Sequence, residues 1–140
     1  MVAAMIRRAL LIAAVLAGPT LAQDRAAAER QTLGELAYAL GESHALRQLC
    51  AGPGDQYWRD RMLRLTQVEN SDQALDAVLR ERFNLGFASG QSQATACNGA
   101  SRRAEAAAAS RGQALAQTLS RVMRRNAPPP QTPQEPPVEP

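Results

Sequence analysis

The chain has 140 residues and a formal charge of +3 at pH 7, from 16 basic residues (all of them Arg) against 13 acidic ones. Two of those arginines, Arg7 and Arg8, belong to the N-terminal segment, so residues 23–140 carry 14 Arg against 13 acids, a net charge of +1. A chain so close to neutrality lacks the clustered positive charge that favours nucleic-acid binding, so we expect no nucleic-acid partner.

Residues 1–22 are predicted to be a cleavable secretion signal. The arginine pair gives a positive head, nine apolar residues follow at 9–17, and small residues precede a cleavage site after Ala22. The apolar run has about half of the roughly 20 residues that a membrane span needs. We therefore expect a mature chain that begins at Gln23, keeps no stable membrane span and lies in the periplasm.

Residues 24–126 are predicted to form a single all-α domain, a small bundle of about four helices. Helix-forming Ala, Leu, Arg, Gln and Glu dominate, aromatic residues make up only 4% of the chain, and no segment alternates with the period of a strand. Apolar residues recur instead at steps of three and four. The expected helices span residues 25–50, 55–69, 71–97 and 101–125.

The first expected helix ends at Gly52-Pro53-Gly54, because glycine and proline in series favour a turn. Asp55 is then placed to cap the second helix through its carboxylate. This second helix is too short to run back along its long neighbours. Either residues 51–56 descend in extended form or the third helix bends near Gly86, and the sequence leaves both open.

The third expected helix follows Asn70-Ser71, a pair that ends the second helix and caps the third. Its seam of apolar and small residues continues to Cys97. Gly86 and Gly90 lie within this seam and weaken the helix by about 1 kcal/mol each relative to Ala. Asn98 and the glycine after it break the chain before the fourth helix.

Residues 127–140 contain seven prolines in fourteen positions. Proline fixes φ and removes the amide donor, so this stretch is expected to be a disordered, extended tail that reaches at most about 40 Å. The tail serves either as a spacer or as a docking peptide, since proline-rich segments are pre-extended ligands.

Cys50 and Cys97 are predicted to form a disulfide. Cys50 ends the first helix and Cys97 ends the third, so an up-down-up arrangement brings both to the same pole of the bundle. An exported protein meets an oxidising compartment, where such a bond forms and persists.

Between about residues 33 and 97 the chain contains, in this order, ELAYALGESHALRQLC, YWRDRMLRL, RFNLGF and a later lone cysteine. With these segments it resembles an uncharacterised family of small exported alphaproteobacterial proteins. Its members carry a signal segment and two well-separated cysteines thought to pair, which supports the same disulfide here. The family has no assigned activity, so the resemblance implies no catalytic residues.

Catalytic and metal-binding constellations are missing from the sequence. His44 is the only histidine and shares the apolar stripe of the first helix, so we interpret it as a buried structural residue. Ser43 is its neighbour, but adjacent helical residues point about 100° apart and do not face each other. The two cysteines lie 47 positions apart, without the close ligand spacing of a zinc site. We expect no enzyme activity, no metal and no cofactor.

The charged residues are interpreted mainly as a solvated face with ion pairs at i, i+4, namely Asp55 with Arg59, Asp60 with Arg64 and Asp76 with Arg80. One group is a candidate interaction surface, because Trp, Tyr and Arg are the usual anchors of protein interfaces. Trp58 is also the expected core anchor of the second helix. The candidate surface comprises Tyr57, Trp58, Arg59, Arg61 and Arg64.

These observations favour a non-enzymatic accessory or interaction module of the periplasm whose partner is another envelope protein. A helical chaperone of the stress type is a second hypothesis, although Leu65-Thr66-Gln67 fails to match the LTxxQ motif of such proteins. A ligand carrier or enzyme with a pocket between helices is the third. A polar pocket around His44 would favour this third hypothesis, whereas an exposed apolar groove would favour a protein partner.

Overall fold

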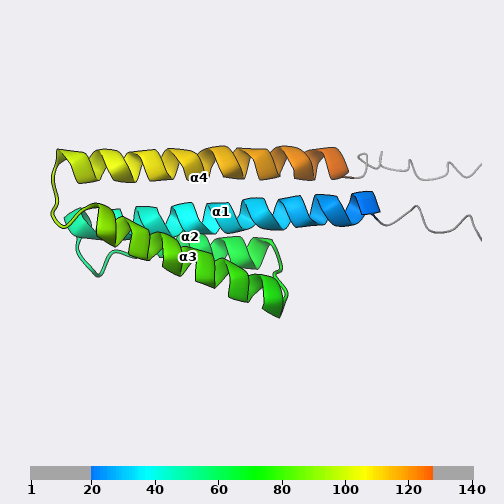
Figure 1. The fold of residues 1–140 in the computed structure, drawn as a ribbon, viewed down its shortest axis with the longest axis horizontal. Coiled ribbons are helices and arrows are strands. Elements are labelled where there is room, and N and C mark those ends of the chain that lie inside the picture. The colour runs from blue at the N-terminus through cyan, green and yellow to red at the C-terminus, as the bar shows by residue number, and fades with distance from the viewer. Residues whose placement is uncertain (1–19, 128–140) are drawn as a thin grey trace, which may run out of the picture.

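The computed structural model describes residues 20–127, with side chains from residue 26 onwards, and this part of the chain forms four α-helices and no strand (Figure 1). The prediction of an all-α bundle is confirmed. The proline-rich tail and most of the secretion signal lie outside the described residues. The helices are α1 (Thr20–Ala51), α2 (Tyr57–Val68), α3 (Gln73–Gln93) and α4 (Gly99–Asn126).

Helix α1 is the centre of the bundle, and the other three helices pack against it. Helix α4 runs along one side of α1, while α2 and α3 cover the other side (Figure 1). This position explains why α1 is buried almost continuously from Leu33 to Leu46. The core cluster contains Leu33, Leu36, Ala37, Leu40, Met62, Leu75, Leu79 and Leu119.

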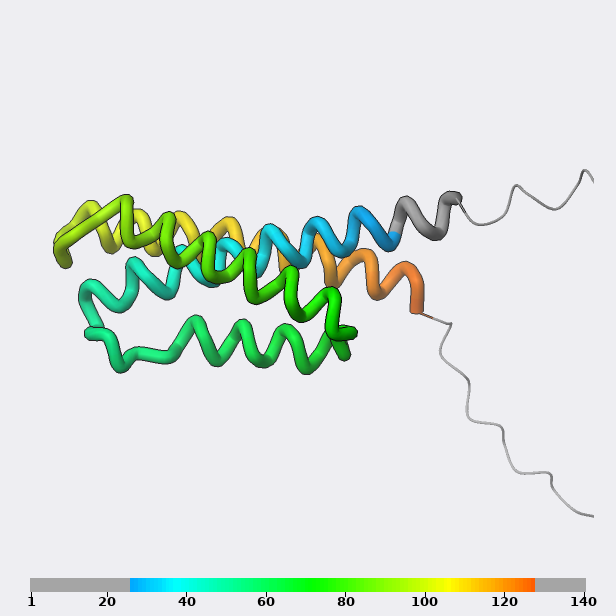
Figure 2. Tube along the Cα trace, turned by 60° about the horizontal axis from the view of Figure 1, so that its bottom comes forward, coloured from blue at the N-terminus to red at the C-terminus, as the bar shows by residue number. Residues whose placement is uncertain are grey.

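Helices α1 and α3 approach each other so closely that only glycine fits at the crossing. A Cβ atom added to Gly86 would clash with the carbonyl of Tyr38, and one added to Gly41 would clash with the carbonyl of Phe83. Helix α3 continues through Gly86 without a break. Residues 52–56 form a non-helical connection that leads into α2 (Figure 2), but they include a turn in which the Asp55 amide donates to the Gly52 carbonyl, so the connection is not the fully extended descent that the sequence left open.

The helix ends differ in detail from the prediction. Asp55 lies one residue before the cap position of α2, yet its carboxylate still accepts the Tyr57 amide. Asp72, and not Ser71, caps α3, because the Asp72 carboxylate accepts the Leu75 amide. Asn70 ends α2 with a positive φ of 46°.

Helix α3 ends at Gln93, one turn earlier than the sequence pattern suggested, so Cys97 lies in the connection to α4. The expected disulfide is nevertheless present: Cys50 and Cys97 are bonded, with their Cα atoms 4.9 Å apart. Asn98 then caps α4 through a reciprocal pair of hydrogen bonds with Ser101.

Candidate functional site

An aromatic platform lies at the start of α2, where two guanidinium groups stack on one exposed ring. Tyr57 is 41% exposed. The Arg61 guanidinium carbon lies 3.5 Å from the Tyr57 ring centroid and that of Arg47 lies 4.6 Å from it. The Trp58 ring meets Tyr57 edge to face, with centroids 4.9 Å apart. We call these four residues, Arg47, Tyr57, Trp58 and Arg61, the α2 platform.

The α2 platform is held in place by contacts from three other parts of the fold. Arg47 of α1 donates to the Asp55 carboxylate at 2.9 Å, and its guanidinium lies 3.7 Å from Glu105 of α4. Trp58 donates from its indole nitrogen to the same Glu105 at 3.1 Å. Burial opposes ionisation of Asp55, but hydrogen bonds from Arg47 and from the Tyr57 amide outweigh it and lower the Asp55 pKa. These contacts therefore hold the exposed Tyr57 ring in a fixed position.

The five residues predicted as an interaction surface are brought together only in part. Tyr57, Trp58 and Arg61 are in mutual contact. Arg59 and Arg64 are exposed on the same helix. Trp58 is half-buried and packs against the core, as expected of the core anchor of α2, and its ring also meets that of Tyr57 edge to face.

Sequence reasoning missed Arg47 and Glu105 as members of this site. Glu105 lies 47 residues from Trp58, and neither residue carries a local signal that would reveal the contact. The spacing of Arg47 and Asp55, eight residues apart across a turn, was the one available hint.

A groove of about 570 Å³ opens beside the α2 platform, between α2 and α4. Its floor is the apolar face of α1 around Leu36 and Leu40, and one wall is Trp58 with Arg61. The opposite wall is a face of α4 made largely of small residues, among them Ala109 and Gly112. We call this the α2–α4 groove.

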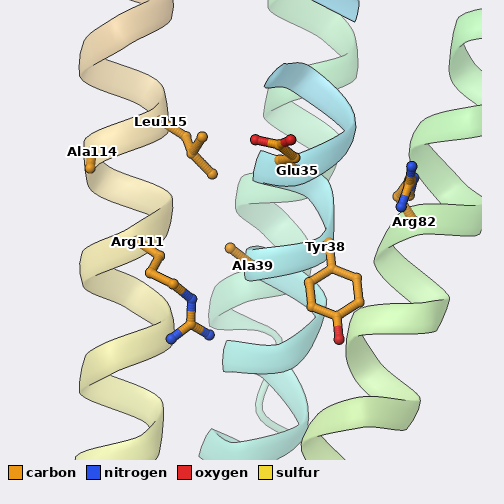
Figure 3. A pocket seen from close by; sticks show the side chains of 7 residues that line it. All are labelled: Glu35, Tyr38, Ala39, Arg82, Arg111, Ala114 and Leu115. Carbon is orange, nitrogen blue, oxygen red and sulfur yellow. The ribbon is translucent and has the colours of Figure 1, made fainter. Parts of the chain in front are cut away.

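A second groove, of about 560 Å³, lies on the other side of α1, between α3 and α4 (Figure 3). Arg111 and Leu115 extend into it from α4, and Tyr38 lies toward α3, which contributes Arg82. We call this the α3–α4 groove. The Arg111 guanidinium is already paired with the carboxylate of Glu42, a buried residue of α1.

His44 lies in neither groove. It is only 4% exposed and its ring packs against Phe83 and Phe87, with centroids 5.8 and 5.5 Å away. Its Nε2 is 3.3 Å from the Gln48 amide, and its Nδ1 has no hydrogen-bond partner. Burial lowers the His44 pKa, and the charge of Arg59 acts in the same direction, with smaller opposing effects from Asp55 and Asp60. The interpretation of His44 as a buried histidine within the first helix agrees with this position.

The described residues contain neither a membrane-spanning helix nor a cluster of metal ligands. Between residues 20 and 127, no helix is both long and apolar enough to cross a membrane. The same part of the chain holds no group of three or more His, Cys, Asp or Glu side chains placed to share a metal ion.

The fold and the site define a small all-α protein closed by one disulfide, with an exposed aromatic platform next to an apolar groove. The chain belongs to the family of proteins of unknown function DUF2385, which matches residues 29–122. This match includes both cysteines and the entire α2 platform, and it confirms the resemblance to an uncharacterised family. No curated protein and no solved structure matches the chain.

Proposed function

We propose that this protein is a non-enzymatic interaction module of the periplasm that binds an acidic segment of another envelope protein on the α2 platform. The observation that carries the proposal is the exposed Tyr57 ring, stacked under the guanidinium groups of Arg47 and Arg61. Tyr, Trp and Arg are the residues that most often dominate binding energy at protein interfaces. Because the platform is already ordered, binding requires little further loss of side-chain entropy.

The charge of α2 indicates the chemistry of the partner. Arg59, Arg61 and Arg64 are exposed, whereas Asp60 is the one acidic residue within that helix. An acidic segment with an apolar or aromatic side chain would satisfy the arginines and cover the ring of Tyr57. Such complementarity increases the association rate and selects against basic partners.

The proposed location rests on the N-terminal segment and on the disulfide. The positive head, short apolar run and small-residue cleavage site fit export, and the Cys50–Cys97 bond fits an oxidising compartment. In the part of α1 whose side chains the structure describes, from residue 26 onwards, the first buried residue is Leu33, well after the proposed cleavage site at Ala22. Mass spectrometry of the exported protein should find Gln23 at or next to the N-terminus; intact Met1 in a membrane fraction would contradict the location.

The open, apolar character of the α2–α4 groove favours a protein partner over a ligand carrier or an enzyme. The α3–α4 groove gives the carrier hypothesis a specific place, with Arg82 and Arg111 among its lining residues. Glu42 neutralises Arg111, however, so Arg82 is the arginine of this groove that Glu42 does not pair with. A groove of this kind offers a small anion little attraction.

Site-directed photo-crosslinking in the native host tests the proposal. Arg64 lies on the same face of α2 as Tyr57 and Arg61, so a photoreactive residue in its place should give one discrete protein adduct. The same probe at the exposed Leu85 of α3 should give none. The charge reversal Arg61→Glu should abolish the adduct, whereas the matched reversal Arg80→Glu on α3 should leave it. An adduct that survives Arg61→Glu, or that forms equally from both positions, would refute the role of the α2 platform.

A further inference from the structure

The α2–α4 groove does not stop beside Trp58 but continues toward the C-terminal end of α4. A second hollow, of about 440 Å³, shares Gln113 and Ala116 with the groove and extends along Arg121 and Arg124. The two hollows therefore form one channel that follows α4 back from its C-terminal turn to the α2 platform.

The charge of this channel has one sign. Its lining includes Arg61 of α2 together with Arg121 and Arg124 of α4, and it includes no Asp or Glu. Near Arg61 the floor consists largely of small and apolar side chains, whereas the part beside Arg121 and Arg124 also presents the polar side chains of Gln113, Gln117 and Ser120. The channel thus matches an extended segment that carries carboxylates, offers apolar surface and contains no basic residue.

We propose that residues 128–140 of this same chain fold back along α4 and occupy the channel. This segment follows directly on the end of α4 and contains seven prolines, Glu135, Glu139 and Val138 but no basic residue. Proline-rich segments bind in aromatic-lined grooves because their extended form is set in advance and little entropy is lost on docking. Trp58 supplies the aromatic wall, and the three arginines complement the two glutamates.

The length of the segment fits the channel. From Asn126 back to Ala106, α4 covers about 30 Å at 1.5 Å per residue. Thirteen residues at roughly 3.1 Å each extend for about 40 Å, which is enough to follow the whole channel. If the segment runs back along α4 in this extended form, Val138, its one large apolar residue, reaches the level of Trp58. The docked segment would then cover one side of the α2 platform.

Paramagnetic NMR on the full mature chain tests this placement. Trp58 is the only tryptophan, so its indole N–H gives a single, unambiguous signal. With the native disulfide intact, a spin label on Val138→Cys should remove most of the intensity of that signal. The same label on Gln131→Cys, which the register places near Arg124, should leave it largely intact. Adding Arg121→Glu and Arg124→Glu to the Val138→Cys chain should restore the signal, whereas Arg82→Glu, in the other groove, should not.

A mixed sample separates docking within one chain from docking between chains. Isotope-labelled chains without a spin label, combined with spin-labelled chains without the isotope, should show no loss of the Trp58 signal. A loss in the mixed sample would place the segment on a second copy and overturn the proposal, as would the absence of any loss in either sample. Both proposals involve the surface around Trp58 and Arg61, but docking of residues 128–140 requires no partner protein. The crosslinking experiment and the NMR experiment can therefore fail separately.

Discussion

Glu42 and Arg111 form an ion pair between α1 and α4, although the Glu42 side chain is only 7% exposed and that of Arg111 is 55% exposed. Gln93 of α3 donates its amide to the other oxygen of the same carboxylate. One buried side chain therefore connects three helices. It lies in the C-terminal half of α1, toward the end of the bundle that the disulfide closes.

Replacing Arg111 by Ala should lower the free energy of unfolding by about 2 kcal/mol, because the buried carboxylate loses its charged partner and keeps only the Gln93 amide. The cost is below that of a fully buried pair because water reaches the exposed side of Arg111. Urea denaturation of the oxidised protein measures it. Arg103→Ala, on an exposed position of the same helix, should change stability by no more than about 0.5 kcal/mol. Equal effects of the two substitutions would show that the ion pair does not stabilise the fold.

The glycine crossing of α1 and α3 gives a second prediction. An alanine Cβ at Gly86 would lie 2.8 Å from the Tyr38 carbonyl carbon, and backbone cannot yield as a flexible side chain can. Gly86→Ala should therefore destabilise the protein by about 3 kcal/mol, against the usual preference of helices for Ala.

Gly112→Ala is the matched control, since Gly112 is also a buried helical glycine. Its added Cβ would meet Ala39 and Leu36 at 3.6 and 3.7 Å, which is ordinary van der Waals contact. Stability should rise by about 1 kcal/mol through helix propensity. Thermal unfolding of both variants gives the two signs directly. A stabilising Gly86→Ala would mean that α1 and α3 do not cross at this glycine.

The sequence predicted the helices well because each one depends on local periodicity. The spacing of apolar residues along α1 and α3, and the break at Gly52, where φ is +94°, are local properties. The disulfide followed from helix order, which brings the ends of the first and third helices to the same pole, together with the oxidising compartment expected of an exported protein. The prediction that Asn70-Ser71 caps α3 was wrong. Asp72 caps this helix, and because Ser and Asp side chains can both cap, only the path of the chain decides between them.

The candidate site was predicted only where its residues are neighbours in sequence. Tyr57, Trp58 and Arg61 share one turn of helix, whereas Arg47 and Glu105 reach them from other helices. The interpretation of the charges as a solvated face is confirmed for Asp76 and Arg80, which pair at 2.9 Å. Asp55 instead pairs with Arg47, eight residues before it. The Glu42 ion pair was not predicted, because periodicity cannot show that a carboxylate between apolar neighbours has partners 51 and 69 residues away.

The disulfide should supply a large share of the stability. Cys50 and Cys97 are 47 positions apart, and a crosslink over such a loop contributes roughly 4 kcal/mol by restricting the unfolded chain. The double variant Cys50→Ser/Cys97→Ser should lose about this amount in urea denaturation, and reduction of the native protein should have the same effect. Digestion with trypsin under non-reducing conditions should release residues 48–59 joined to residues 83–102. Recovery of both peptides separately, with free thiols, would refute the bond.

His44 predicts how stability depends on pH. Its folded-state pKa lies below the ordinary value of 6.5 because burial disfavours the charged ring. In addition, Nδ1 has no hydrogen-bond partner, so no acceptor is in place for the proton that it would carry in the charged form. The unfolded chain therefore binds more protons than the folded one in this range, and stability falls as the pH drops through 6.5, until the pH lies below the folded-state pKa. The Asp72 pKa is lowered by hydrogen bonds from the Leu75 amide and from Arg30. The stability that this carboxylate contributes is lost only when the pH falls below its ordinary pKa of 3.8, so it does not overlap with the effect of His44.

The matched variant is His44→Gln, which keeps a polar side chain near Gln48 but does not titrate. Urea denaturation of both proteins at about pH 8 and about pH 5.5 isolates the histidine, because most carboxylates remain ionised at both values. The native chain should lose more stability than the variant between these two conditions, even if the variant is less stable at each of them. An identical loss in both proteins would mean that His44 protonates as easily in the folded bundle as in the unfolded chain, and that the space between Phe83 and Phe87 admits water.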